Sequence, residues 1–155
     1  MSKHRATISW KCTGADFGNG KYSREHTWSF DGGTVVPASS SPSVVPAPWS
    51  NPASVDPEEA YVAAVSSCHM LTFLYLAGKA GFHVDSYEDE AIGTMTKNER
   101  GTPWLSAITL QPKISYIGSK QPNPVEEEHL HHEAHEQCFI AQSIKTEVTV
   151  TAPQS

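Results

Sequence analysis

Arginine is scarce in this chain: Arg5, Arg24 and Arg100 are its only arginines among 155 residues. Acidic residues outnumber basic ones by 17 to 11, so the formal net charge is -6 at pH 7. A surface that binds nucleic acid or anionic lipid needs a basic patch. The composition offers no such patch, and we expect neither nucleic acid nor a membrane among the partners of this protein.

Cysteine is equally scarce, with Cys12, Cys68 and Cys138 as the three examples. An odd number does not suit a framework of structural disulfides, and no apolar signal segment opens the chain at residues 1–5. We therefore expect a cytoplasmic protein with reduced thiols, in which any disulfide forms transiently during catalysis. Nothing in the sequence predicts a cofactor.

The strongest local pattern predicts a long helix over residues 56–81. Asp56 is a suitable N-cap, Pro57 suits the first helical position, and Glu59 completes a capping box. Gly81 can take the left-handed conformation that ends a helix. The residues between these limits are apolar on all sides, which is typical of a buried or membrane-spanning helix. Polar residues around Cys68, at the centre, favour a buried helix in a soluble protein.

The rest of the chain alternates between strand and helix patterns, and the length suits one domain. The expected order is N-terminal strands over residues 1–37, a Pro/Ser-rich loop over 38–55, the central helix over 56–81, strands over 82–118, a second helix over 123–143 and a last strand over 144–152. This order predicts the α+β class. A single small subunit has difficulty burying the long helix, so dimerisation around it is expected.

Three stretches of the sequence resemble the OsmC/Ohr family of thiol peroxidases. They are Asp56-Pro57-Glu58-Glu59, Cys68-His69-Met70 in the same predicted helix, and Cys138-Phe139-Ile140-Ala141-Gln142-Ser143 seventy residues after Cys68. The resemblance covers most of the chain. It implies antiparallel sheets around a long buried central helix, an intertwined homodimer with two interfacial active sites, and reduction of organic hydroperoxides or hydrogen peroxide. It also implies regeneration by dithiols of the lipoyl or thioredoxin kind.

The resemblance implies roles for four residues. Cys68 would attack the peroxide as a thiolate and become a sulfenic acid, which Cys138 would condense to a disulfide. The family activates its reactive cysteine with an arginine, held by a glutamate that matches Glu58, and Arg24 is the best match for that arginine by position. Glu58 lies ten residues before Cys68, about 15 Å along a helix, and cannot contact it within one chain. Dimerisation would then be part of catalysis.

Two other hypotheses remain open from the sequence. His131 and His135 are one helical turn apart and Cys138 follows three residues later, a plausible three-ligand stripe for zinc in a metal-binding module. Alternatively, the chain is a non-catalytic relative that keeps the fold and the cysteines for ligand binding or redox sensing. His69 either assists the neighbouring thiol or is a hydrogen-bonded polar residue at the dimer interface.

Overall fold

The structure is a computed structural model that describes residues 1–151. Backbone contacts divide the chain into two compact units, Met1–Ala60 and Tyr61–Ser155, and each is described by itself below. The described residues form two α-helices and eight strands, so the α+β class is confirmed. The single domain over residues 1–155 stays a prediction.

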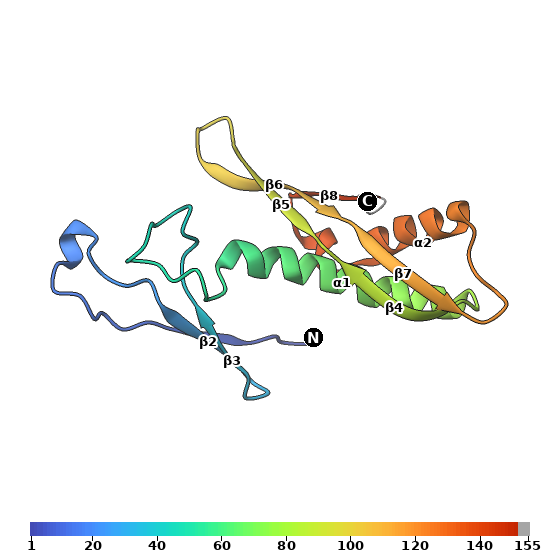
Figure 1. Cartoon of the computed structure of the whole chain (residues 1–155), viewed down its shortest axis with the longest axis horizontal. Coiled ribbons are helices and arrows are strands. Elements are labelled where there is room, and N and C mark those ends of the chain that lie inside the picture. Colours follow the sequence, from blue (N-terminus) through green and yellow to red (C-terminus); the bar gives the residue numbers. More distant parts are fainter. Residues whose placement is uncertain (152–155) are drawn as a thin grey trace. The chain divides into compact units, whose positions relative to one another are not determined.

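The first unit contains an antiparallel meander of three strands (Figure 1). Its strands are β1 (Ala6–Ser9), β2 (His26–Phe30) and β3 (Val35–Ala38). The predicted turn between β2 and β3 is present, and Gly33 adopts a φ of 90° there, a conformation that favours glycine. Residues 39–56 form the predicted loop, in which the buried Ser39 hydroxyl accepts a hydrogen bond from the Asn51 amide at 3.0 Å.

The long helix α1 covers Pro57–Lys79. Its predicted capping box is confirmed: the Glu59 amide donates to the Asp56 carboxylate at 2.8 Å, and the Asp56 amide donates to Glu59 at 3.1 Å. The buried residues form one stripe rather than a full circumference, namely Val65, His69, Phe73 and Ala77. The rest of the apolar surface of α1 is not fully buried within one chain, as expected for a small subunit, and its burial in a dimer stays a prediction. Among the described residues α1 alone is long and apolar enough to cross a membrane, a test that core helices also pass.

Five strands follow α1 or end the chain in the second unit. They are β4 (His83–Asp89), β5 (Ile92–Lys97), β6 (Pro103–Leu110), β7 (Pro112–Ile117) and β8 (Glu147–Val150). The β4–β7 and β5–β6 pairs are antiparallel as predicted, whereas β6 and β8 run parallel, which corrects the expectation of purely antiparallel sheets. The chain leaves one sheet for the other at Gln111, whose amide donates to Asp89 at 2.6 Å instead of continuing a ladder.

The second helix, α2, covers Pro124–Gln137 and is shorter than the predicted range 123–143. Its start agrees with the prediction, because Asn123 and Glu126 exchange the two hydrogen bonds of a capping box at 2.9 Å each. The helix ends because Cys138 takes an extended conformation (ψ 115°), and a short 3-10 helix follows at Ala141–Ser143. Cys138 is thus a C-cap and not a helical residue. Residue 152, at the end of the predicted last strand, lies outside the described residues.

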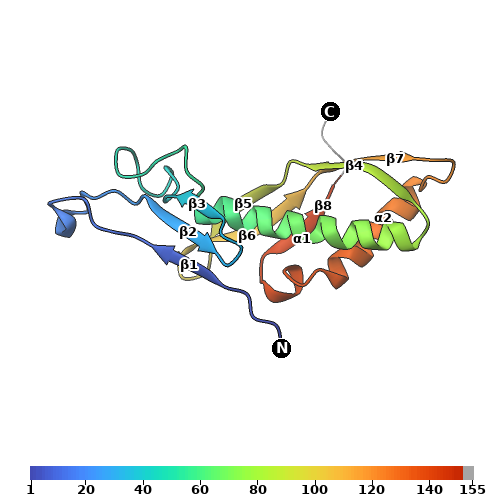
Figure 2. The same ribbon diagram turned by 90° about the horizontal axis from the view of Figure 1, so that it is seen from below.

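Helices α1 and α2 lie side by side in the second unit (Figures 1 and 2). One apolar cluster joins them, with Phe73 and Ala77 from α1 packed on Leu130 and Ala134 from α2. A second cluster packs Val65 of α1 on the sheet at Ile108 and Leu110. Burial of such side chains contributes about 1.5–3 kcal/mol each, so these contacts hold the helices and the sheet together.

A pair of histidines interrupts this apolar contact. His69 of α1 and His131 of α2 are 1% and 8% exposed, and their Nε2 and Nδ1 atoms are hydrogen-bonded at 3.0 Å. Burial lowers the pKa of His69 to about 4, with His135 adding to this effect and Asp89 opposing it. Burial also lowers the pKa of His131 to about 4, and His69 contributes to that shift. Both imidazoles are therefore neutral at pH 7 in the folded protein.

This pair predicts that acid destabilises the protein. Between pH 6.5, the usual histidine value, and pH 4, the unfolded chain binds more protons than the folded one. The free energy of unfolding is therefore greatest above pH 6.5 and falls as the pH drops toward 4, by roughly 3 kcal/mol for each imidazole. Urea unfolding at pH 7.5 and pH 5, at fixed protein concentration, measures this decline.

Two variants control that measurement. His69→Leu/His131→Phe removes both buried imidazoles and is expected to flatten the decline, whereas His129→Gln, at an exposed position of α2, leaves it unchanged. An acid-induced loss as steep in the double variant as in the wild type would contradict the assignment of this effect to the pair.

Candidate functional site

The two candidate catalytic cysteines lie together in the second unit. Cys68 is half-buried in the middle of α1, where the Thr72 hydroxyl donates to its carbonyl oxygen at 2.9 Å. Cys138 is fully buried at the end of α2. Both are free thiols, and they lie close enough together that Cys68 affects the pKa of Cys138. The packing of α1 on α2 thus brings together two cysteines that are distant in the sequence.

The environment of Cys138 favours its neutral thiol. Burial raises the pKa of Cys138, and the neighbouring Cys68 thiol raises it further. Backbone N–H groups act in the opposite direction, because the Ala141 amide donates to the Cys138 sulfur at 3.5 Å and Ile140 also contributes. These donors come from the turn that follows the C-cap. A thiolate that forms at Cys138 during a reaction has donors ready to stabilise it.

Arg24 lies in the first unit, at the wall of an apolar hollow of about 440 Å³. Its guanidinium donates to the carbonyl oxygens of Gly20 and Tyr22 at 2.6 and 2.5 Å and stacks 3.6 Å from the Tyr22 ring centre. The hollow is lined by Ile8, Trp10, Phe17, Tyr22, Arg24, His26, Ser40 and Pro57. Its wall therefore combines aromatic side chains with one fixed cation.

Glu58, the other predicted site residue, is half-buried near the start of α1 in the first unit. Its Oε2 atom is buried and has no hydrogen-bond partner within the described residues. The salt bridges of residues 1–151 are Lys21–Asp16 and His129–Glu133, so Arg24 and Glu58 do not pair within one described chain. Glu58 is consequently a carboxylate with an unused acceptor. A buried acceptor of this kind is costly unless a donor meets it.

The predicted zinc stripe does not form a metal site in residues 1–151. No group of three His, Cys, Asp or Glu side chains among them is arranged to hold a metal ion. His131 uses its Nδ1 atom on His69, and Cys138 lies against Cys68 instead. The zinc hypothesis therefore has no support from the geometry of the described residues.

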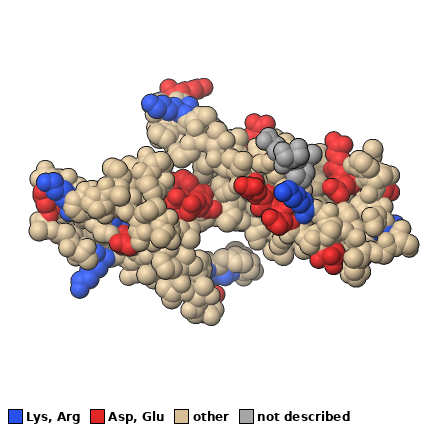
Figure 3. Space-filling model, in the orientation of Figure 1, with Lys and Arg blue, Asp and Glu red and all other residues tan. Residues whose placement is uncertain are grey.

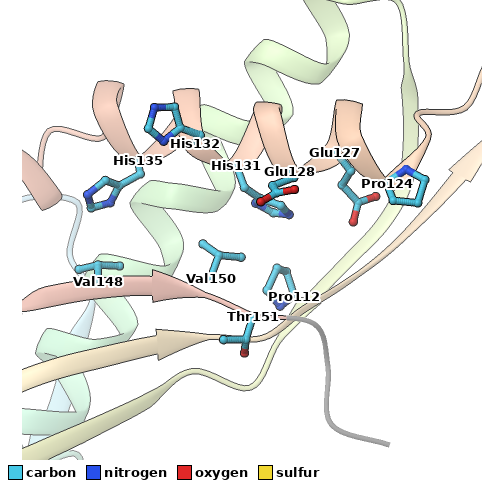
Figure 4. A pocket seen from close by; sticks show the side chains of 10 residues that line it. All are labelled: Pro112, Pro124, Glu127, Glu128, His131, His132, His135, Val148, Val150 and Thr151. Carbon is cyan, nitrogen blue, oxygen red and sulfur yellow. The ribbon is translucent and has the colours of Figure 1, made fainter.

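A cavity of about 530 Å³ borders the histidine pair (Figure 4). Helix α2 contributes Pro124, Glu127, Glu128, His131, His132 and His135, and the opposite wall consists of Pro112 of β7, Val148 and Val150 of β8, and Thr151. His131 thus belongs both to the pair and to this wall.

The drawn face of the described residues has no broad basic patch, because its Lys and Arg side chains occur singly (Figure 3).

Sequence reasoning missed the contact between His69 and His131. We predicted that His69 was either an aid to Cys68 or a polar residue at the dimer interface, whereas it lies within its own chain's core. The four-residue spacing of Val65, His69, Phe73 and Ala77 could have revealed this, because residues at that spacing share one helix face. The partner could not be read from the spacing, since it comes from the other helix.

Solved structures resemble this chain over nearly its whole length. An OsmC-like protein of unknown function from Vibrio cholerae is 48% identical, with a TM-score of 0.94, over 98% of this chain and 99% of the other. An organic hydroperoxide resistance protein from Legionella pneumophila is 14% identical, with a TM-score of 0.70 over 99% of this chain and all of the other (100%). The organic hydroperoxide resistance protein OhrB of Bacillus subtilis is 18% identical, with a TM-score of 0.65 over 97% and 98%.

The two more distant similarities show a shared fold and nothing more. No curated protein matches the chain. The sequence profile of the family described as OsmC-like protein matches residues 50–152, which is more than half of the chain. With this match and the 48% identity to the Vibrio cholerae protein, the chain belongs to the OsmC-like family.

Proposed function

We propose that this protein is a cysteine-based peroxidase that reduces organic hydroperoxides, and hydrogen peroxide is the second substrate in the test below. The observation that carries the proposal is the proximity of two free thiols, the half-buried Cys68 and the fully buried Cys138. A pair of this kind suits a thiol that reacts with an external oxidant and a second thiol that resolves the product. The names of the Legionella and Bacillus proteins, which share the fold, agree with this chemistry.

The proposed reaction begins at the accessible thiol. Cys68 attacks as a thiolate on one peroxide oxygen, the O–O bond breaks, and the other oxygen leaves as an alcohol after taking a proton. Cys68 is then a sulfenic acid. The sulfur of Cys138 attacks the sulfur of Cys68, the hydroxyl leaves as water, and a disulfide results. An external dithiol of the lipoyl or thioredoxin kind then reduces this disulfide, which suits a reducing compartment such as the cytoplasm.

Arg24 and Glu58 are proposed to support the first step. The guanidinium of Arg24 would stabilise the Cys68 thiolate and the leaving oxygen, and the free acceptor of Glu58 would orient the guanidinium by a charge-assisted hydrogen bond. The aromatic wall beside Arg24 would bind the apolar part of an organic hydroperoxide. This wall supports organic hydroperoxides over hydrogen peroxide as the better substrates.

The proposed assembly is a homodimer built around α1. Large apolar side chains remain exposed on the single chain, including Leu71 and Tyr75 on α1, both 61% exposed, and Phe139 beside Cys138, 84% exposed. Apolar surface of this extent commonly marks an interface with another protein. In such a dimer, residues of the second chain would complete each active site.

The dimer predicts a specific particle mass. Sedimentation equilibrium at micromolar concentration should give twice the 16.9 kDa of one chain. Leu71→Glu/Tyr75→Glu places charges on the exposed face of α1 and should shift the mass to that of one chain. The matched control Val125→Glu, at an exposed position of α2, should remain dimeric. A wild type that sediments at 16.9 kDa would refute the proposed assembly.

The peroxidase proposal is tested by single-turnover kinetics. Prereduced protein is mixed with cumene hydroperoxide or hydrogen peroxide, and free thiols are counted over time. The wild type should lose two thiols rapidly, with cumene hydroperoxide the faster substrate. Cys68→Ser should abolish the rapid phase, whereas Cys138→Ser should consume one equivalent of peroxide and stop at a Cys68 sulfenic acid. Dihydrolipoamide or reduced thioredoxin should restore both wild-type thiols.

The same assay tests the arginine. Arg24→Gln removes the proposed cation and should slow the first step about 100-fold, the range reported for loss of one electrostatic stabiliser. Arg100→Gln, at an exposed turn, should react at the wild-type rate. Thiol loss no faster than that of free cysteine in the wild type would refute the enzyme, and equal rates in the two arginine variants would remove Arg24 from the site.

A further inference from the structure

The hydrogen bond between His69 and His131 stands at a defined place relative to the two cysteines. His69 directly follows Cys68 in α1, and His131 precedes Cys138 by two helical turns, about 10 Å along α2. Among the side-chain hydrogen bonds of residues 1–151, this bond alone connects α1 with α2. The contact therefore joins the two elements that carry the reacting thiols.

The ring of His131 is also fixed by stacking. Its centre lies 4.4 Å from the ring of Phe73 and 5.3 Å from the ring of His69, both on α1, at interplanar angles of 27° and 12°. With 8% of its surface exposed, His131 has little room for another orientation. The hydrogen bond thus fixes one point of α2 on one point of α1.

The remaining contact between the helices is apolar. Phe73 and Ala77 pack on Leu130 and Ala134, and such burial stabilises the contact without selecting a direction. A hydrogen bond weakens steeply when its distance or angle changes. A small sliding or rotation of α2 would therefore break the histidine bond at a cost that the apolar cluster alone does not impose.

We propose that the His69–His131 hydrogen bond is a positioning contact that fixes the register of α2 on α1 and so holds the Cys138 thiol beside Cys68. Neither imidazole contacts the reacting sulfur atoms in this scheme; each acts through the helix that carries it. The inference rests on the proposed function for its biological meaning, because it concerns the resolving step. In physical terms, the histidine bond is proposed to raise the effective concentration of the Cys138 thiol at Cys68.

The experiment measures that effective concentration without peroxide. The full-length protein is equilibrated at pH 7.5 in buffers of reduced and oxidised glutathione, acid-quenched, and the Cys68–Cys138 disulfide is quantified by mass spectrometry. His131→Phe keeps an aromatic ring against the α1 side chains but has no ring nitrogen to make the bond. It should lower the effective concentration about tenfold, the effect of losing one hydrogen bond and leaving a buried nitrogen unpaired.

Two further variants separate positioning from general stability. His131→Asn places a side-chain amide near the position of Nδ1. The amide can accept from His69 or donate to it, so this variant should remain within about threefold of the wild type. Ile108→Ala creates a cavity in β6, away from the α1–α2 contact, and should lower the unfolding midpoint in urea while also staying within about threefold.

The outcomes distinguish this proposal from the peroxidase. An unchanged value in His131→Phe overturns the positioning role, and so does a loss in His131→Asn or in Ile108→Ala as large as that in His131→Phe. A wild type that forms no Cys68–Cys138 disulfide in any glutathione ratio also overturns it. A failed peroxide assay alongside the expected glutathione series would refute the enzyme and leave the positioning contact intact.

Discussion

The packing of α1 on α2 is the constraint on which the proposed chemistry depends. Cys68 and Cys138 are far apart in the sequence, and their thiols are neighbours because Phe73 and Ala77 bury their side chains against the second helix. The same packing removes Cys138 from solvent and leaves Cys68 partly accessible. In the proposed reaction, an external oxidant would therefore reach Cys68 first, and the buried Cys138 thiol would react second.

A buried polar pair in this contact has a cost and a use. Neutral imidazoles at His69 and His131 replace apolar side chains that would fill the same space, and they make the fold sensitive to acid because their protonated forms are poorly accommodated there. In return, a directional contact distinguishes one arrangement of the helices from its neighbours, which apolar packing does poorly. The same histidine pair that is proposed to position the two thiols therefore also lowers the stability of the protein at low pH.

Local signals in the sequence predicted local structure well. Asp56 with Glu59 and Asn123 with Glu126 form the expected capping boxes, because these hydrogen bonds involve residues only three positions apart. The family motifs led to both cysteines. The end of α2 was not predicted, because residues 138–143 contain no glycine or proline to stop a helix. The parallel pairing of β8 with β6 and the His69–His131 contact were not predicted either, because both depend on tertiary packing. Arg24 and Glu58 remain predictions, because the dimer that would complete their site involves a second chain.

The central claim is that Cys68 and Cys138 of one chain form a disulfide on reaction with a hydroperoxide. The most direct measurement mixes unlabelled and ¹⁵N-labelled chains, adds one equivalent of cumene hydroperoxide, and maps disulfide-linked peptides by mass spectrometry after digestion at low pH. The account predicts a Cys68–Cys138 link whose two peptides always carry the same isotope. Links between isotopes, a link to Cys12, or a Cys68 sulfinic acid beside a free Cys138 thiol would contradict it.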